Sequence, residues 1–545
     1  MSLNSKNTHL VMSWQEWSHY DALGLAELVH TKQVTAGELA CQTVKAVEII
    51  NPMLEAVLEI FMDSVENPNL DHPNLVGKLY GVPFFLKDLN ARMKGRLQEQ
   101  GSKLFKGYVA EETDPLIENF LRAGLVILGR STVPEMGFTI DTATSYLGRF
   151  MITRNPWNLE RTAGGSSGGA GALVASGVTP LSMSSDGAGS TRFPASFNGL
   201  IGLKASRGRL PTPARTNEYV VPESVPGVLT RSVRDWAVAL DYMACVPNGG
   251  SFMKVLPFDG SYLDVINQPS GRLRIALSTG LWGCSQPPDP QVVMHTHQVA
   301  RVLEGLGHFV EEVKDETICD FEAARRAFMV HWVCSAGEIH LMAEDMGIPS
   351  AELQNYLDPM TYKHVEAADR YSKFDLWRAT YINPLVTRSF GKFFETYDAL
   401  LTPTSAILVP TAAGPYSLLC KDDPFEVWYE QFFSAARYTH PANHTGLPAI
   451  SFPSGLDDDG LPIGVQLYAN FLREDLLLQL ASQLELAKPE WFNQLPAYHI
   501  SRNGGSPQLY NTHGHKLCFP AQENAQFVTA LGKNIRIACG YHTPF

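Results

Sequence analysis

The 545-residue sequence lacks the features that mark several common protein classes. Its eight cysteines show no Cys-x-x-Cys spacing, which disfavours a disulfide scaffold and favours reduced thiols in a cytoplasmic protein. No run of eighteen apolar residues occurs, so we expect no transmembrane helix. Residues 1–17 contain no apolar segment of the kind that forms the core of a secretory signal peptide, so none is expected.

Basic residues are also scarce. Lysine and arginine number 43 against 56 aspartates and glutamates, the formal net charge is −13, and the basic residues form no cluster. Nucleic acids and anionic membranes are therefore disfavoured as partners. The short histidine pairs His295/His297 and His513/His515 have no convergent partners in the sequence, so we expect neither a metal site nor another cofactor.

What the sequence does contain is a segment of small residues, residues 161–196. Two groups rich in glycine and serine, 164–169 and 186–190, flank the run Ala170–Ser176, which is predicted to form a buried helix. Glycine allows positive φ and close backbone approach, so both groups can direct N–H groups inward. A flexible linker is disfavoured by the apolar run between them. A phosphate loop is disfavoured because no Lys-Ser/Thr pair closes a glycine loop.

Three motifs together resemble the amidase signature family. The first is Gly-Gly-Ser-Ser-Gly-Gly at 164–169, and the second is Asp-x-x-Gly-Ser-x-Arg-x-Pro-Ala-Ser from Asp186. The third is GVPFFLKD at 81–88. The resemblance implies an α/β/α fold with a large mixed central sheet covered by helices. We expect one domain over residues 1–494, with a helical lead-in at about 15–70, and a C-terminal extension of unknown role over 495–545.

The resemblance also implies a Ser-Ser-Lys triad. Ser190 is the nucleophile, Ser166 relays the proton, and neutral Lys87 is the final base. A lysine that ends an apolar strand usually reaches solvent, but burial would lower its pKa into the range of a base. A cis peptide bond is implied before Ser166. The oxyanion hole is implied to consist of the backbone N–H groups of Gly187, Ala188, Gly189 and Ser190.

Residues beside the triad are expected to support it. Asp186 and Arg192 flank the nucleophile and are suited to a charge-assisted structural network. Ser167 and Ser185 are candidate supporting hydroxyls.

Candidates for the substrate pocket come from less distinctive segments. Met136 lies in a Pro-Glu-x-Gly segment that resembles the family's loop near the substrate entrance, and Phe193 follows the nucleophile motif. Residues 315–400 are predicted to be helical, and in this family the corresponding region shapes the pocket. Trp332 and Cys334 are its candidate wall residues, although a plain helix-core role competes for each of them.

The function implied is hydrolysis of a carbon–nitrogen amide bond other than a peptide bond, through an acyl-enzyme, in a small-molecule substrate. The form Asp-x-Ala-Gly-Ser at 186–190 is similar to that of the aminohexanoate cyclic-dimer hydrolases, so aryl, cyclic or linear aminoalkanoate-type amides are expected. Two alternatives stay open: an amidotransferase A-type subunit that releases ammonia from glutamine in a complex, and a non-catalytic binding protein on the same fold. A homodimer is open as well.

Overall fold

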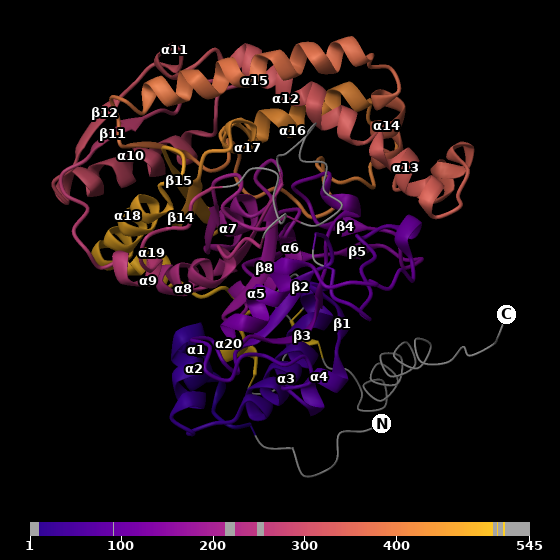
Figure 1. The fold of residues 1–545 in the computed structure, drawn as a ribbon, viewed down its shortest axis with the longest axis vertical. Coiled ribbons are helices and arrows are strands. Elements are labelled where there is room, and N and C mark those ends of the chain that lie inside the picture. The colour runs from indigo at the N-terminus through magenta and orange to yellow at the C-terminus, as the bar shows by residue number, and fades with distance from the viewer. Residues whose placement is uncertain are drawn as a thin grey trace.

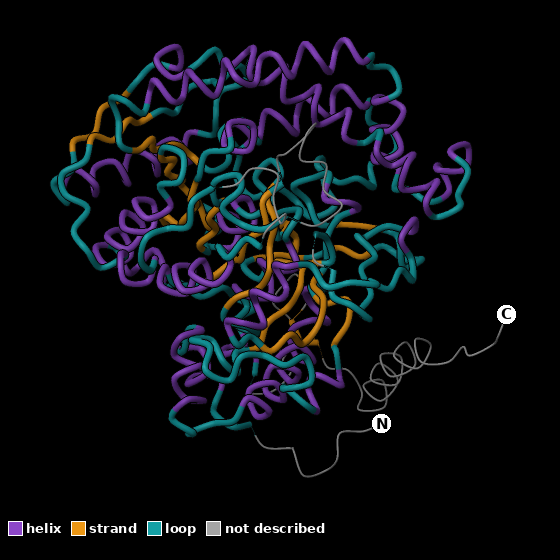
Figure 2. Tube along the Cα trace, viewed as in Figure 1, coloured by secondary structure: helices purple, strands orange, loops and turns teal. Residues whose placement is uncertain are grey.

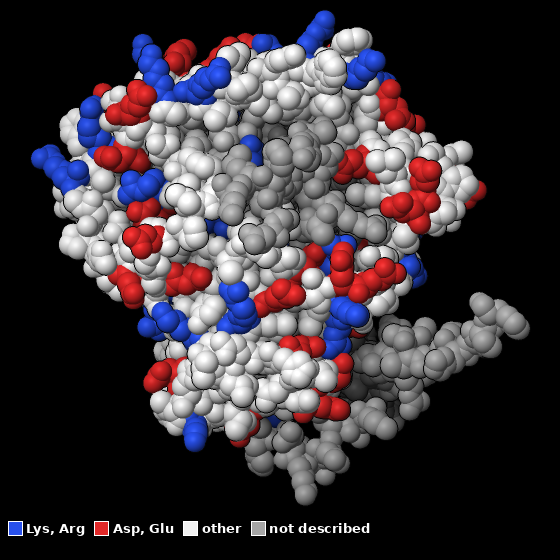
Figure 3. Space-filling view, in the orientation of Figure 1, with Lys and Arg blue, Asp and Glu red and all other residues white. Residues whose placement is uncertain are grey.

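A computed structural model describes residues 10–90, 92–212, 224–247, 255–504, 509–510 and 516–517. The strands run from the middle of the molecule to one side, where β11 (Arg274–Leu277) and β12 (Phe309–Glu312) lie (Figures 1 and 2). The N-terminal helices form one end, and helices from the middle of the sequence form the other. Within the described residues, no helix is long and apolar enough to cross a membrane. On the face drawn in Figure 3, acidic and basic side chains are interspersed.

The main sheet has eight strands in the order β12-β11-β13-β15-β14-β9-β10-β8. Strand β11 pairs in parallel with β12 and β13, whereas the other pairs are antiparallel, so the sheet is mixed as predicted. Its strands are β8 (Leu181–Asp186), β9 (Ile201–Lys204), β10 (Val225–Thr230), β11 (Arg274–Leu277), β12 (Phe309–Glu312), β13 (Ala399–Pro403), β14 (Ala449–Leu456) and β15 (Pro462–Ala469).

A second, three-stranded sheet lies beside the edge strand β8. It has the order β1-β3-β2, with strands β1 (Val57–Ile60), β2 (Pro83–Lys87) and β3 (Val126–Ser131). Side-chain hydroxyls join the two sheets: Ser182 Oγ donates to the Phe85 carbonyl at 3.1 Å, and Thr179 Oγ1 donates to the Pro83 carbonyl at 2.6 Å. These bonds place the end of β2 next to the end of β8, where the motif residues lie.

Helices α1–α4 pack at the N-terminal end, over the residues of the expected lead-in, whereas α5 packs against α8 (Val233–Met243). The capping box predicted at Thr35 is confirmed, since Thr35 Oγ1 accepts from the Glu38 N–H at 3.2 Å and Glu38 Oε2 accepts from the Thr35 N–H at 2.8 Å. The helices are α1 (Trp14–His19), α2 (Ala22–His30), α3 (Ala36–Leu54), α4 (Met62–Glu66) and α5 (Pro115–Ala123).

The helix predicted at Ala170–Ser176 is present as α6 (Gly168–Ala175), and all of its residues are buried. Its small side chains let neighbouring segments approach closely: a Cβ added at Gly169 would lie 2.4 Å from the Thr132 nitrogen. Further helices around the main sheet are α7 (Arg192–Asn198), α8 (Val233–Met243), α9 (Tyr262–Val265), α10 (Pro290–Gly305), α18 (Glu474–Ala487) and α19 (Pro489–Phe492).

The middle of the chain forms a separate group of helices, as predicted for residues 315–400. It buries an aromatic cluster that includes Phe328, Trp332, Phe432 and Phe433. The helices are α11 (Asp315–Ile318), α12 (Phe321–Ser335), α13 (Glu338–Asp345), α14 (Pro359–Ala368), α15 (Lys373–Phe393), α16 (Phe425–Ala435) and α17 (His440–Thr445).

Short elements complete the described residues. The remaining strands are β4 (Ala143–Thr144), β5 (Met151–Ile152), β6 (Arg154–Asn155), β7 (Asn158–Thr162), β16 (Leu509–Tyr510) and β17 (Lys516–Leu517). The 3-10 helices are η1 (Lys103–Phe105), η2 (Glu135–Gly137) and η3 (Ser350–Asn355).

The first residues of the expected C-terminal extension pack against the body. Helix α20 (Ile500–Asn503) follows His499, and the Ile500 N–H donates to the Ser176 carbonyl at 2.8 Å. A Cβ added at Gly177 would lie 2.4 Å from the His499 ring. The helix predicted near 522–531 lies outside the described residues. The division into residues 1–494 and 495–545 stays a prediction.

Candidate active site

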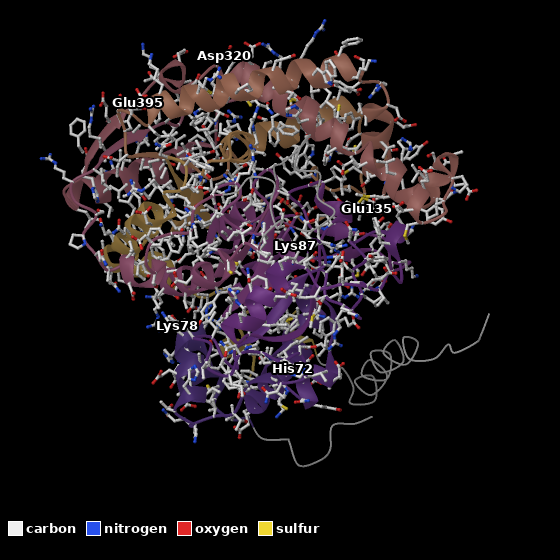
Figure 4. All side chains as sticks on the ribbon, in the orientation of Figure 1. His72, Lys78, Lys87, Glu135, Asp320 and Glu395 are labelled. Atoms are coloured by element: carbon white, nitrogen blue, oxygen red, sulfur yellow. The ribbon has the colours of Figure 1, made fainter. Side chains whose placement is uncertain are left out.

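Lys87 is the last residue of β2, and its side chain is directed into the centre of the molecule (Figure 4). It is 1% exposed. Its ammonium nitrogen lies 2.8 Å from Ser166 Oγ and 2.9 Å from Ser185 Oγ. The lysine therefore does not reach solvent, because hydroxyls from two other segments enclose its charged end.

Burial changes the proton affinity of this lysine. Removal from water lowers the pKa of Lys87 to about 7, although the Asp186 carboxylate opposes the shift. A charged ammonium is poorly solvated in such a place, so the neutral amine becomes accessible near neutral pH. Lys87 can therefore accept a proton under conditions in which an exposed lysine is fully charged.

The segment before α6 brings Ser166 to this lysine and Ser167 to β8. The Gly165–Ser166 peptide bond is cis, as the family resemblance implies. Ser166 is 2% exposed, and its hydroxyl accepts from Lys87. Ser167 faces β8 instead: its Oγ donates to the Ser185 carbonyl and accepts from the Ser185 N–H, each at 3.3 Å. Ser167 and Ser185 thus hold the two motif segments together.

Ser190 lies in the loop that connects β8 to α7. The Ser167 N–H donates to the Ser190 carbonyl at 3.3 Å, which joins this loop to the Ser166 segment. Ser190 is 7% exposed, and its hydroxyl makes no hydrogen bond to another described residue. A hydroxyl that is accessible and unbonded is available to a substrate.

The N–H groups of the loop differ from one another. Within the described part of the chain, those of Gly187, Ala188 and Ser190 find no acceptor. The Gly189 N–H, in contrast, donates to Asp186 Oδ1 at 2.7 Å. This corrects the expectation that Gly189 belongs to the oxyanion hole, because its only backbone donor is already used.

Asp186 and Arg192 form a fully buried ion pair beneath the loop. Arg192 Nε lies 2.9 Å from Asp186 Oδ2, and neither side chain is exposed. Burial alone would raise the pKa of Asp186, but the guanidinium and its hydrogen bonds lower it to about 2. Arg192 also donates to Asn443 Oδ1 at 2.7 Å and to Gln466 Oε1 at 3.1 Å. The pair therefore has partners on α17 and β15.

Two of the predicted pocket residues lie near these loops, and the first is Met136. It is half-buried in η2, next to Gly137, where an added Cβ would lie 3.0 Å from Ser166 Oγ. Glu135 secures this segment, since its carboxylate accepts from Ser102 Oγ at 2.6 Å and from the Asp358 N–H at 2.7 Å (Figure 4 labels Glu135).

The second, Trp332, lies against the nucleophile loop itself. A Cβ added at Gly187 would lie 3.3 Å from Cζ3 of the Trp332 ring. The ring also packs edge-to-face on Phe138, with centroids 5.9 Å apart. An aromatic wall therefore borders the residues that carry Ser190.

Of the other two pocket predictions, the one for Phe193 is corrected by the structure. Phe193 is completely buried and lies behind the loop, where a Cβ added at Gly189 would lie 2.8 Å from its ring. It supports the loop from below. Cys334 is half-buried and packs against the same aromatic cluster as Trp332, so its place in the pocket stays a prediction. Burial, reinforced by the Asp375 carboxylate, raises the pKa of Cys334 to about 11.

Two residues of the site were not singled out from the sequence. Thr439 Oγ1 donates to the Ala188 carbonyl at 2.6 Å, and Asn443 Nδ2 donates to the Asp186 carbonyl at 2.8 Å. Asn443 opens the segment Asn-His-Thr-Gly-Leu-Pro-Ala, which carries part of the family resemblance, and this was the available signal. Among the described residues, no group of three or more His, Cys, Asp or Glu side chains could hold a metal ion.

Comparison with known proteins identifies the class. The family model described as Amidase matches residues 38–478, so the chain belongs to the amidase family, whose members hydrolyse non-peptide carbon–nitrogen amide bonds. It is 33% identical over 485 residues to a 6-aminohexanoate-cyclic-dimer hydrolase of Paenarthrobacter ureafaciens, covering 87% of this chain and 96% of the relative.

A solved structure of 6-aminohexanoate cyclic dimer hydrolase superposes with a TM-score of 0.81 and 31% identity, covering 88% of this chain and 99% of the other. The A-type subunit of a glutamyl-tRNA(Gln) amidotransferase from Prochlorococcus marinus is 31% identical over 508 residues, covering 87% of this chain and 97% of the relative. The predicted family, fold and class of reaction are thus confirmed.

Proposed function

We propose that this protein hydrolyses a small amide through an acyl-enzyme formed on Ser190. The observation that carries the proposal is the buried Lys87 ammonium 2.8 Å from Ser166 Oγ, next to the loop of Ser190, whose hydroxyl has no hydrogen-bond partner within the described residues. A serine needs a base to become a nucleophile, and a lysine with a pKa near neutrality can supply one.

In the proposed mechanism, Ser190 Oγ attacks the amide carbonyl and its proton passes through Ser166 to neutral Lys87. The N–H groups of Gly187, Ala188 and Ser190 stabilise the oxyanion that develops on the carbonyl oxygen. The proton then returns through Ser166 to the departing amine, and the C–N bond breaks. Water hydrolyses the acyl-Ser190 ester with the same groups acting again, which releases the acid and restores the serine.

The substrates that we propose are aryl, cyclic or linear aminoalkanoate-type amides. The names of the similar hydrolases support the aminoalkanoate class. The Trp332 ring beside Gly187 and the Phe138 ring beside Trp332 provide an apolar surface next to the nucleophile. Such a surface suits the carbon chain or ring of an uncharged amide. A cytoplasmic location and a homodimer stay predictions.

A second candidate is an amidotransferase A-type subunit, which would release ammonia from glutamine within a complex. The similarity to the Prochlorococcus protein supports it, because 97% of that protein aligns with 87% of this chain. The two functions share the acyl-enzyme step and differ in the acceptor and in the need for companion proteins. A non-catalytic binding role on the same fold is disfavoured, because all three residues of the triad are present and Lys87 contacts Ser166.

The test is amine release from a panel of amides by the purified protein. The panel contains an aryl anilide, short primary amides, glutamine and the cyclic aminohexanoate dimer, with Ser190→Ala as the control. Turnover of the anilide or the cyclic dimer that disappears in the variant supports the proposal. Glutamine turnover alone favours the amidotransferase role. Wild type that is unreactive toward every amide and toward a fluorophosphonate probe overturns the nucleophile assignment.

A further inference from the structure

Three carbonyl groups of the nucleophile loop accept hydrogen bonds that orient its peptides. The Asp186 carbonyl accepts from Asn443 Nδ2 at 2.8 Å, and the Ala188 carbonyl accepts from Thr439 Oγ1 at 2.6 Å. The Gly189 carbonyl accepts from the Phe193 N–H at 2.7 Å. Two of these three bonds therefore come from outside the loop and its flanking strand and helix.

A peptide unit is planar, so fixing its carbonyl also fixes the direction of the N–H on its other side. The bond from Asn443 to the Asp186 carbonyl sets the direction of the Gly187 N–H. The bond from Thr439 sets the 188–189 peptide, whose N–H goes to Asp186 Oδ1. This peptide lies between the unbonded N–H groups of Ala188 and Ser190, and its orientation limits where both can point.

Both outside donors come from one turn of the chain. Thr439 immediately precedes α17 and Asn443 lies within it, four residues later, so their side chains share one face. This turn is 251 residues away in sequence from the carbonyl that Thr439 holds. The packing is tight, because a Cβ added at Gly189 would lie 2.7 Å from Thr439 Oγ1.

We propose that Thr439 and Asn443 are positioning residues that aim the N–H groups of the nucleophile loop at the substrate's developing oxyanion. The proposal rests on the proposed function, since it assumes that Ser190 is the nucleophile. Neither side chain needs to touch the substrate. Oxyanion donors act only when they are directed at the position that the oxyanion occupies, so a loop with freely turning peptides stabilises the transition state less.

The two residues differ in how cleanly they can be tested. Asn443 also donates to Asp186 Oδ1 at 3.0 Å and accepts from Arg192, so its replacement disturbs the buried ion pair as well. Thr439 makes one hydrogen bond with the loop, and its hydroxyl otherwise lies 3.0 Å from the Ala436 carbonyl. Thr439 is therefore the residue to change.

The experiment compares Thr439→Val and Thr439→Ala with Thr445→Val. Thr445 is the matched control because it is a buried threonine of the same helix whose Oγ1 donates to the Pro441 carbonyl at 2.7 Å. We expect kcat to fall about 10-fold to 100-fold in both Thr439 variants. We expect KM within about twofold of wild type, the same pH midpoint as wild type, and recovery in Thr439→Ser.

Three results would overturn this inference while leaving the nucleophile assignment intact. The first is a wild-type kcat in both Thr439 variants. The second is a loss of kcat in Thr445→Val that is as large as the loss in the Thr439 variants. The third is a loss seen only in KM, because that is the effect of weaker ground-state binding. If the Thr439→Val protein does not fold because the added methyl group lies against Gly189, the Thr439→Ala protein provides the measurement. Failure of the proposed function gives a different result from failure of this inference. If the proposed function is wrong, Ser190→Ala retains the wild-type rate.

Discussion

The segment 161–204 and the helical region 315–445 form two sides of the same site, and they use different types of residue. The first uses small residues in a row, and hydrogen bonds between closely packed segments hold it together, as between Ser167 and Ser185. The second uses large aromatic side chains, and some of its buried donors have no partner within the described residues, among them Trp332 Nε1 and Trp428 Nε1.

This difference indicates that segment 161–204 carries out the chemistry and that the helical region contacts the substrate. Fully paired, close-packed groups such as Asp186 and Arg192 hold one geometry, which proton transfer and oxyanion stabilisation require. Aromatic side chains offer apolar contact area, which favours binding of a substrate's carbon skeleton without setting the geometry at the reacting atom. The chemistry should therefore be sensitive to changes in segment 161–204, and substrate preference should be sensitive to changes in the helical region.

The largest effect is expected from Ser190→Ala. It removes the nucleophile, so kcat should fall by about 10⁴-fold or more. Amine release is the measurement, with circular dichroism to show that the variant folds. The buried Ser176→Ala, whose hydroxyl donates to the Leu173 carbonyl away from the site, is the control. Activity in Ser190→Ala near that of the control would refute the assignment.

The next effect is expected from pH and from Lys87. Burial lowers the pKa of Lys87 to about 7, so the amine is neutral above that pH and charged below it. Activity should rise as pH increases through about 7 and fall about tenfold per unit on the acid side. Lys87→Met should remove this limb along with most of kcat. A pH–rate profile that is flat down to about pH 5 would contradict a lysine base.

Asp186→Asn should mainly change stability. It leaves the Arg192 guanidinium buried without its carboxylate, and removing one partner of a buried pair costs about 3–5 kcal/mol. Denaturant unfolding measures this cost. Because the Asp186 charge raises the pKa of Lys87, any folded variant should show its activity midpoint at lower pH than wild type. An unchanged stability would mean that the pair contributes little.

The smallest effect is expected from Trp332→Leu, and it should concern selectivity. Loss of the ring beside Gly187 should raise KM for aryl amides about tenfold, because less apolar surface contacts the substrate. The kcat of small primary amides should hardly change. Phe432→Leu, one ring further from the loop, is the comparison, since the Phe432 ring centroid lies 5.9 Å from that of Trp332. Equal losses for all amides would place Trp332 in the chemistry instead.

The sequence by itself determined the family, the mixed-sheet fold and the residues that the proposed mechanism uses. The glycine and serine motifs indicate the family and the fold because each motif sets the backbone conformation of its own segment. At Gly169, for example, the backbone of Thr132 comes so close that a residue with a Cβ atom would not fit. The buried helix α6 and the capping box at Thr35 were predictable for the same reason, since each depends on residues within one or two turns.

Tertiary structure alone decided which side chains meet the nucleophile loop. Nothing in the local sequence distinguishes Trp332 from the other aromatic residues of its helix, and only the packing of α12 places its ring at Gly187. Likewise, the Gly189 N–H donates to the Asp186 carboxylate and is therefore not available to an oxyanion. Thr439 bonds to Ala188, which is 251 residues away in the sequence. Such contacts depend on where distant segments pack, and local spacing contains no information about that.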